Sequence, residues 1–204
     1  MQNTNTQSDL SKAHSARKKL KEVQDDQKVQ RTRSSFRQKT PSKSTTKSRK
    51  PRKTLEQKTA QQLVKPTDEA FSRYIRIRDA SWDGTKWVGK CITCPRQCVV
   101  IDEFGKWIAS SQNGHMISRG VFSLRYDEEN CNLQCAHCNV WLDKDEMIER
   151  YRTELDKKYG DGTYKKLKAL SKLPEAYKRP SKPELLQIIA DSKEQVEWYL
   201  AHNT

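Results

Sequence analysis

The sequence predicts a small α+β protein whose compact part is stabilised by a bound metal ion. Three observations favour this fold class. Only 33% of the 204 residues are hydrophobic and 32% are charged, so the apolar core must be small. Two C-x2-C pairs, CITC and CAHC, have the spacing of a tetrahedral zinc site. Short strand-like segments lie around these pairs, and longer segments with a helical period precede and follow them.

Residues 1–55 carry most of the positive charge. They contain 16 Lys and Arg against 4 Asp and Glu, a net of +12 out of +14 for the whole chain. This segment is polar and nearly free of aliphatic side chains, so we expect a disordered basic arm. The charge favours a nucleic-acid partner bound through salt-sensitive phosphate contacts. A solubilising tail is the alternative.

Signals for a membrane or for export are missing from the sequence. No stretch approaches the roughly 18 consecutive apolar residues of a membrane span. The polar N-terminus has no apolar signal segment. Without an export signal, two C-x2-C pairs favour metal over disulfides. We therefore expect an intracellular protein with no membrane partner.

Residues 56–80 predict two helices that are interrupted at Pro66. Thr67 is a suitable N-cap for the second helix. The apolar face of that helix follows helical spacing at Phe71, Tyr74, Ile75 and Arg78. Arg73 and Arg76 lie away from that face. They could contact phosphates, or they could be ordinary solvated arginines.

Residues 81–158 predict the compact core. Asp83-Gly84 is a turn signal for a short hairpin within residues 82–88. A strand over residues 99–101, a turn at Gly105 and a second strand over 107–109 follow. Further on, we expect a strand and loop from Ser111, then the second cysteine pair leading into a helix.

Residues 159–204 predict a helical extension. It contains a short basic helix over residues 164–170 and a last helix that opens at Lys182. The last helix has an apolar stripe formed by Leu185, Ile188, Ile189, Val196, Tyr199 and Leu200. The stripe would pack on the N-terminal helix or on a second subunit.

Four of the six cysteines are the predicted zinc ligands: Cys91, Cys94, Cys135 and Cys138. A closed four-thiolate site is structural and not catalytic. Cys98 could compete as a ligand, but its three-residue gap from Cys94 fits the pair spacing less well. We expect Cys131 to be a small buried apolar side chain.

Three polar residues near these cysteines could carry chemistry. His115 can accept a proton from water near neutral pH. Asn139 directly follows the last cysteine, and its amide oxygen can bind Mg²⁺. Asn130 can brace the loop or the imidazole. Each residue also has an ordinary structural alternative, but their combination at this spacing favours hydrolysis of a phosphodiester.

The sequence resembles a known family over roughly residues 63–200. The matching runs are FSRYIRIRDA, CITC, GHMISRG, SLRYDEEN, LQCAHCN and WLDKDEMIERYRTEL. They resemble the NinG (also called Rap) recombination proteins of lambda-like phages. Those proteins look related to HNH, or ββα-metal, nucleases with an added four-cysteine zinc site. The resemblance implies a zinc-stabilised ββα-metal (HNH-like) core with flanking helices, and it does not extend to the basic arm.

The resemblance also implies a function and its partners. The expected activity is an endonuclease that cuts branched recombination intermediates such as Holliday junctions and D-loops. DNA and a phage recombinase are the expected partners, and the host cytoplasm is the expected location. Symmetric cutting of a two-fold junction suggests a homodimer, with the last helix as a candidate interface.

Individual roles carry over from the family pattern. His115 matches the general base, Asn130 the middle asparagine and Asn139 the helix-borne ligand of Mg²⁺ or Mn²⁺. Many HNH-like enzymes place an acidic ligand just before the histidine, where this chain has Gln112-Asn113-Gly114. Asp143 or Asp145 could supply that carboxylate, or both could be acids that favour a helix N-terminus.

The remaining candidates are arginines and aromatic residues. Arg119 and Arg125 could clamp the scissile phosphate, although Arg125 could equally pair with Asp127 or Glu128. We expect His137 to be an exposed residue between the zinc ligands. Two further side chains, Trp107 and Trp141, are expected to pack the core and not to stack on bases.

Two other functions fit the same features. A zinc-stabilised protein that binds branched DNA without cutting it would account for the charge, the cysteines and the absent acid before His115. A zinc-ribbon RNA-binding protein is the third option.

Overall fold

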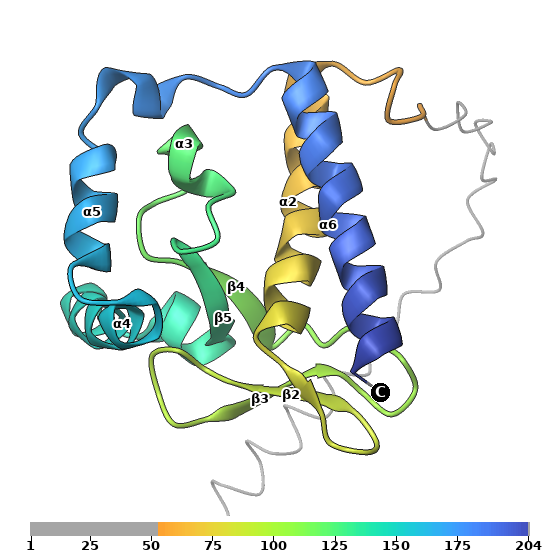
Figure 1. Cartoon of the computed structure of the whole chain (residues 1–204), viewed down its shortest axis with the longest axis vertical. Coiled ribbons are helices and arrows are strands. Elements are labelled where there is room, and N and C mark those ends of the chain that lie inside the picture. The colour runs from red at the N-terminus through yellow and green to blue at the C-terminus, as the bar shows by residue number, and fades with distance from the viewer. Residues whose placement is uncertain (1–52, 204) are drawn as a thin grey trace, which may run out of the picture. The chain divides into compact units, whose positions relative to one another are not determined.

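The computed structural model describes residues 53–203. The predicted basic arm, residues 1–55, therefore lies almost entirely outside the described residues. The described part is α+β, as predicted, with small antiparallel sheets and several helices (Figure 1). The long helices are α2 (Ala60–Arg78), α4 (Lys144–Tyr159) and α6 (Lys182–His202). The shorter ones are α3 (Phe122–Arg125), the π-helix η1 (His137–Trp141), α5 (Thr163–Leu170) and the 3-10 helix η2 (Pro174–Tyr177).

Helix α2 is continuous, so the interruption predicted at Pro66 is wrong. The N-cap is Thr59, whose side chain accepts from the backbone N–H of Gln62, and the Gln62 side chain accepts from Thr59 in return. Thr67 lies inside the helix and donates to the carbonyl of Leu63 at 2.8 Å. A proline in a helix costs about 3 kcal/mol. Burial of large side chains on both sides of Pro66 offsets this cost, at about 1.5–3 kcal/mol each.

Helix α6 packs along α2, and Figure 1 shows the two side by side. Leu185 and Ile189 form one apolar cluster with Leu63, while Val196 and Tyr199 pack on the α2 cluster around Ile75. The predicted stripe on the last helix therefore packs on the N-terminal helix. This packing uses the surface that was the candidate subunit interface.

The strands form two antiparallel sheets. The first has the order β1 (Ser81–Trp82), β2 (Trp87–Lys90), β3 (Gln97–Ile101), and the second pairs β4 (Ser111–His115) with β5 (Cys131–Cys135). The hairpin predicted over residues 82–88 is confirmed, with Gly84 at φ 100° in its turn. The strand predicted over 107–109 is reduced to one bridge between Ile101 and Trp107. Ile101 also pairs with Trp87 of β2, so this bridge lies on the other edge of β3.

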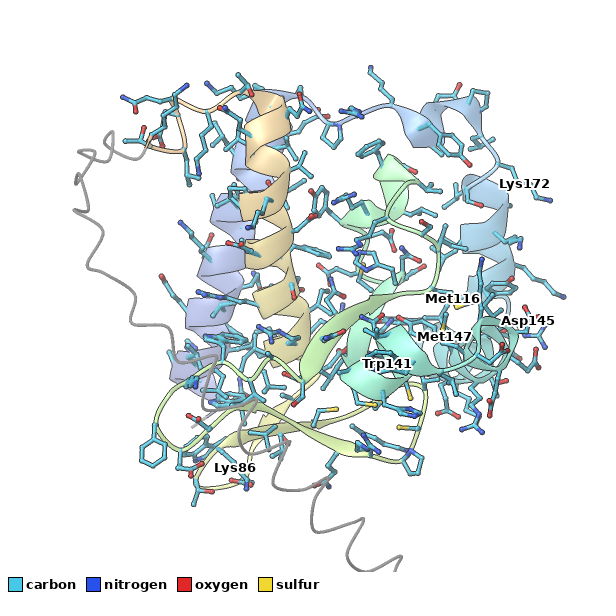
Figure 2. All side chains as sticks on the ribbon, turned by 180° about the vertical axis from the view of Figure 1, so that it is seen from behind. Lys86, Met116, Trp141, Asp145, Met147 and Lys172 are labelled. Atoms are coloured by element: carbon cyan, nitrogen blue, oxygen red, sulfur yellow. The ribbon has the colours of Figure 1, made fainter. Side chains whose placement is uncertain are left out.

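Helices cover both faces of the β4–β5 pair. Cys131 packs against Phe71 and Ile75 of α2. Its neighbour Asn132 points to the opposite face, since side chains alternate along a strand, and there it donates to the Tyr151 hydroxyl of α4. Met116 and Met147 also meet between the end of β4 and α4 (Figure 2). The chain thus forms an antiparallel pair followed by η1 and α4.

Gly114 in β4 allows close packing within this pair. A Cβ atom at this position would overlap the side-chain amide of Gln134 on β5. Gln134 is buried and donates to Thr93 Oγ1 at 2.5 Å. Gly114 therefore leaves room for the Gln134 side chain, and the bond from Gln134 to Thr93 links β5 to the loop that carries the first cysteine pair.

Candidate functional site

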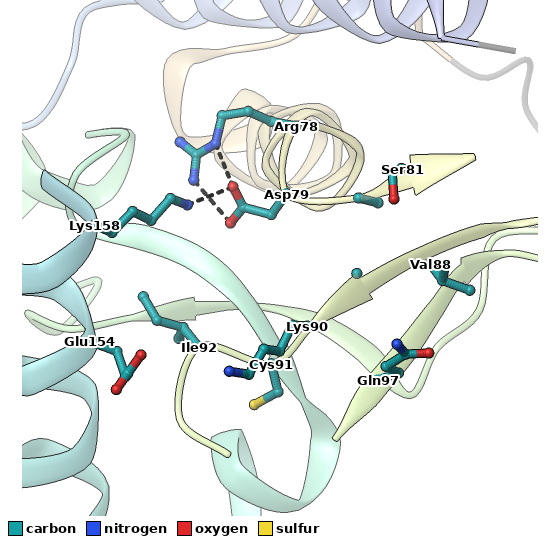
Figure 3. Close-up of a pocket in the computed structure, with 12 residues that line it drawn as sticks. Arg78, Asp79, Ser81, Val88, Lys90, Cys91, Ile92, Gln97, Glu154 and Lys158 are labelled. Carbon is teal, nitrogen blue, oxygen red and sulfur yellow. Dashed lines mark hydrogen bonds and ion pairs between the residues drawn. The ribbon is translucent and has the colours of Figure 1, made fainter. Parts of the chain in front are cut away.

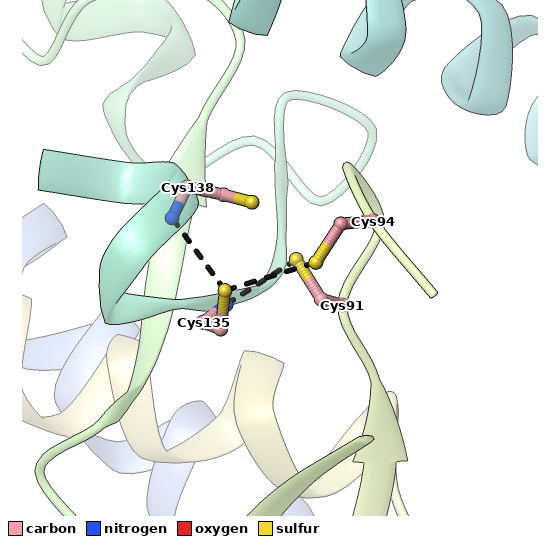
Figure 4. A group of neighbouring side chains, drawn as sticks. All are labelled: Cys91, Cys94, Cys135 and Cys138. Carbon is pink, nitrogen blue, oxygen red and sulfur yellow. Dashed lines mark hydrogen bonds between the residues drawn. The ribbon is translucent and has the colours of Figure 1, made fainter. Parts of the chain in front are cut away.

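Four cysteine sulfurs converge at one end of β5 (Figure 4). Cys91 and Cys94 lie in the turn between β2 and β3, while Cys135 ends β5 and Cys138 lies in η1. All four Sγ atoms lie within 4.8 Å of one another. Zinc–sulfur bonds of about 2.3 Å in a tetrahedron place sulfurs about 3.8 Å apart. The 3.9 Å between Cys94 and Cys135 matches this spacing, so the group fits a structural zinc ion.

Two backbone N–H groups donate to the sulfurs of this centre, and the burial of its thiols favours a bound cation. The Cys135 backbone N–H donates to Cys91 Sγ at 3.3 Å, and that of Cys138 donates to Cys135 Sγ at 3.5 Å. Burial raises the pKa of the Cys91 and Cys138 thiols. These thiols need a nearby positive charge to ionise at neutral pH.

The two other cysteines are not part of the group of four. Cys98 lies in the apolar core, where burial raises its pKa to about 12. Cys131 has no exposed surface and packs against α2. Both are outside the group of four, as expected.

An open cleft of about 870 Å³ lies between α2, β4 and η1. Helix α2 contributes Glu69, Arg73 and Arg76, and the residues after β4 contribute Arg119. Strand β4 and η1 supply the polar candidates His115, Gln112, Asn113 and Asn139. The structure thus brings three of the predicted catalytic residues, His115, Arg119 and Asn139, to one surface.

His115 ends β4 opposite Cys131. Its Nε2 is 3.1 Å from the carbonyl oxygen of Arg125. A carbonyl can only accept, so Nε2 carries the proton and Nδ1 is the basic nitrogen. Burial lowers the pKa of His115 to about 4, and Arg119 and Arg125 contribute in the same direction. The imidazole is therefore neutral at pH 7, as a proton acceptor must be.

Asn130 braces the loop between β4 and β5 and does not touch the imidazole. It has no exposed surface. Its Nδ2 donates to the carbonyls of Ile117 and Leu124 at 3.0 and 2.7 Å, and its Oδ1 accepts from the Ile117 N–H at 2.6 Å. It thus fixes the backbone that carries Arg119.

Asn139 lies in the π-helix η1, ahead of the longer helix α4. Single π-turns are frequent at functional sites. Its Nδ2 donates to Gln112 Oε1 at 2.7 Å. This bond turns the amide so that Oδ1 is the atom left for a cation. Asn113 also lines the cleft, but its Oδ1 is buried and receives no hydrogen bond from residues 53–203.

Asp143 and Asp145 do not line the cleft. Asp143 is the N-cap of α4 and accepts from the N–H groups of Asp145 and Glu146 at 3.0 and 3.2 Å. The carboxylate at the cleft is Glu69, which the sequence interpretation missed. Its signal was a second stripe on α2, in which Glu69, Ser72, Arg73 and Arg76 follow helical spacing beside the apolar face.

Arg125 pairs with Asp68, so the predicted partners Asp127 and Glu128 are wrong. Two parallel bonds, Nε to Oδ1 at 2.8 Å and Nη2 to Oδ2 at 2.6 Å, join the groups. Its Nη1 also donates to the carbonyl of Arg119 at 2.9 Å. The guanidinium that was a candidate phosphate clamp is thus already bonded within the protein.

Trp107 packs against the apolar core, as expected. Trp107 is half-buried beside the cleft, with the guanidinium carbons of Arg76 and Arg73 at 4.8 and 5.6 Å from its ring centre. Trp141 is 78% exposed, so the prediction that it packs the core is wrong. His137 is exposed, as expected.

Comparison with protein families assigns the chain. A family model described as Bacteriophage Lambda NinG protein matches residues 2–199. The chain belongs to the NinG family. The match begins far ahead of residue 63, so the NinG resemblance includes the basic segment that the sequence comparison had left out. No curated protein and no solved structure matches the chain.

No helix within residues 53–203 of this NinG-family chain is long and apolar enough to cross a membrane.

Proposed function

We propose that this NinG-family protein is a metal-dependent DNA endonuclease that cuts branched recombination intermediates such as Holliday junctions and D-loops. The observation that carries the proposal is the state of His115. Its imidazole is neutral at pH 7, its Nε2 is held by the Arg125 carbonyl, and it lines an open cleft with Asn139 and arginines. This combination suits a base that acts on water beside a bound phosphate.

The order of elements supports an HNH-like assignment. An antiparallel pair, β4 and β5, is followed by helical turns in η1 and α4. His115 lies on the first strand, Asn130 just before the second and Asn139 in the turns that follow. This is the order in which the ββα-metal nucleases present their base, their asparagine and their metal ligand.

In the proposed reaction, His115 Nδ1 removes a proton from a water molecule. The water oxygen attacks the phosphorus of the DNA backbone, one ester oxygen leaves, and the leaving oxygen takes a proton from solvent. Asn130 acts on the loop and keeps the Arg125 carbonyl, and hence the ring of His115, in place. Arg119, which also lines the cleft, offsets the negative charge of the scissile phosphate.

The cleft has oxygen atoms that fit Mg²⁺ or Mn²⁺. They are the Oδ1 atom of Asn139 and the carboxylate of Glu69. Hard divalent cations prefer oxygen ligands of this kind. When bound, the cation supplies positive charge to the scissile phosphate and the leaving oxygen.

DNA, a homodimer and a phage recombinase are the partners that we propose. The candidate dimer interface on α6 needs revision, because its apolar stripe packs on α2. A dimer would use another surface. Light scattering of the protein, free and with junction DNA, tests this: a monomeric mass in both states would exclude the dimer.

A non-catalytic protein that binds branched DNA is the second candidate. One observation favours it: Asp143 caps a helix and Asp145 lies away from the cleft, so neither replaces the acid missing before His115. Glu69 is the alternative source of that carboxylate.

Replacement of His115 by alanine separates the two functions. We expect His115→Ala to bind a four-way junction as the wild type does. Its cleavage rate with Mg²⁺ should fall about 10²–10⁴-fold, the usual contribution of general acid–base catalysis. If the two proteins bind equally and neither nicks the DNA, the protein is a junction binder and not a nuclease.

A further inference from the structure

Arg76 is a buried arginine that has no carboxylate partner. Its residue surface is 9% exposed. Nε donates to the Ser72 carbonyl at 3.2 Å, and Nη1 donates to the carbonyls of Ile108 and Ser111 at 3.1 and 2.9 Å. Every one of these acceptors is neutral. Among the eight ion pairs within residues 53–203, none includes Arg76.

Arg78, two residues later on α2, shows the usual solution. Its side chain is 11% exposed, and its guanidinium pairs with Asp79 through bonds of 2.8 and 3.1 Å. Lys158 adds a second cation to Asp79 at 2.7 Å (Figure 3). Arg78 therefore has a carboxylate partner within the protein, whereas Arg76, on the same helix, has none within residues 53–203.

An uncompensated buried charge is unfavourable in the free protein. Burial, with a smaller contribution from the nearby Arg73, lowers the pKa of Arg76 to about 10, yet the group stays protonated at pH 7. Neutral carbonyls do not need a charged donor. The positive charge of Arg76 therefore meets neutral carbonyls and the face of the Trp107 ring, but no anion within residues 53–203.

One part of the Arg76 guanidinium remains available at the cleft. Nη2 makes no hydrogen bond within residues 53–203. It is also absent from the fully buried polar atoms that lack a partner, so it keeps contact with solvent. Arg76 lines the cleft, and its Nη2 can therefore meet an anion that enters there.

Arg73 brings a second cation to the same place. Its side chain is exposed, and both guanidinium carbons lie over the ring of Trp107. The face of an indole ring attracts cations and so holds two like charges close together. Glu69 lies one turn away on α2 but pairs with neither arginine.

We propose that Arg76 and Arg73, held by Trp107, form a preformed subsite for a phosphate of the DNA backbone next to the one that is cut. The phosphate provides the negative charge that Arg76 lacks among its neighbours in the protein. The position next to the cut rests on the proposed nuclease function. The anion site itself does not.

The first test measures thermal unfolding without any divalent metal ion. Inorganic phosphate should raise the Tm of the wild type above its value in chloride at equal ionic strength, since a ligand of the native state stabilises it. Arg76→Met keeps an apolar stem beside Trp107 but removes the charge. Its Tm in chloride should fall less than that of Arg78→Met, because it leaves neutral carbonyls and not a carboxylate without a donor, and the effect of phosphate should disappear.

Arg78→Met is the matched control. It removes an arginine of similar burial from the same helix but leaves Asp79 short of a partner. Its Tm should fall, and its response to phosphate should stay. The proposal is overturned if phosphate does not stabilise the wild type, or if Arg76→Met loses stability as Arg78→Met does and still responds to phosphate.

DNA binding gives a second, independent readout. Without Mg²⁺, Arg73→Gln should lower the slope of log K against log salt by about 0.9, the value for one lost phosphate contact on a duplex. Arg73 is exposed, so this variant should fold even if Arg76→Met does not, and Arg76→Lys should keep the slope because it keeps the charge. An unchanged slope in Arg73→Gln would overturn the subsite. Failure of the wild type to cut with Mg²⁺, while slope and phosphate effects persist, would overturn only the nuclease function.

Discussion

The cysteine centre and the cleft are two polar sites built in opposite ways. The centre gathers four sulfurs within 4.8 Å, and three of the four cysteines are buried. The cleft is open, and its polar groups are amides, an imidazole, a carboxylate and arginines that reach it from separate elements. A complete and closed ligand set leaves no position for a substrate, whereas the cleft leaves atoms such as Asn113 Oδ1 without a partner.

This difference separates the two regions by role: the cysteine centre stabilises the fold, and the cleft is the candidate site of the chemistry. The centre joins the β2–β3 turn to β5 and η1, so its loss should affect the whole fold. The cleft contains groups that the fold does not satisfy, which are destabilising or neutral in the free protein. Changes in the cleft should therefore reduce activity more than stability.

The largest effect is expected from loss of a zinc ligand. Structural zinc contributes about 10–16 kcal/mol to the folding of small zinc domains. This equals or exceeds the total stability of a typical domain, about 5–15 kcal/mol. Cys138→Ser should therefore remove bound zinc and unfold the part of the chain around β5, measured by metal analysis and circular dichroism.

Cys98→Ser is the matched control for that change. Cys98 is also a buried cysteine, but it lies outside the group of four. Serine there places an unpaired hydroxyl in an apolar core, at a cost of about 1–3 kcal/mol. The variant should keep one zinc per chain. Loss of zinc from Cys98→Ser but not from Cys138→Ser would mean that the ligand set is wrong.

The next effect concerns pH and His115. Burial lowers its pKa from 6.5 to about 4, so between these values the unfolded state binds more protons than the folded state. The contribution of His115 to stability is complete above pH 6.5 and is lost as the pH falls toward 4. The loss at pH 5 should be about 2 kcal/mol.

Urea unfolding of the wild type and of His115→Ala at pH 7 and pH 5 measures this contribution. The alanine variant should lose less stability over this interval, since it lacks the titrating group. Equal losses of unfolding free energy in the two proteins would show that burial does not lower the pKa of His115.

The smallest effect separates a helix cap from a metal ligand at Asp143. Because its side chain accepts two backbone N–H groups, Asp143→Ala should cost about 1 kcal/mol. Asp143→Asn should cost little, since asparagine is as good a cap. Both variants should need the same Mg²⁺ concentration for half-maximal cleavage. If both variants needed a much higher Mg²⁺ concentration, Asp143 would be a ligand of the catalytic metal.

The sequence predicts the cysteine centre better than the cleft. The spacing within CITC and CAHC is local, and few arrangements other than a metal site use it. The α2–α6 packing was also accessible, because an apolar stripe on the last helix needs a partner. Pro66 misled the prediction, since local propensity does not include the burial of Leu63 and Phe71 on the two sides of the proline.

Parts of the cleft could not be predicted, because long-range packing assembles it. Glu69 and Arg76 come from a helix that precedes His115 by about 40 residues, and the uncompensated charge of Arg76 is visible only when its neighbours are known. The pairing of Arg125 with Asp68 spans 57 residues, so nearer acids were the natural but wrong partners. The exposure of Trp141 depends on the π-turn of η1.

The central claim is that the cleft carries the chemistry while the cysteine centre only supports the fold. Its most direct test is single-turnover cleavage of a four-way junction by zinc-loaded protein, before and after addition of Mg²⁺. The account predicts a bound but intact junction with zinc alone, cleavage when Mg²⁺ is added, and no cleavage by His115→Ala under either condition. Cleavage by the zinc-loaded protein without Mg²⁺, or an unchanged rate in His115→Ala, would contradict it.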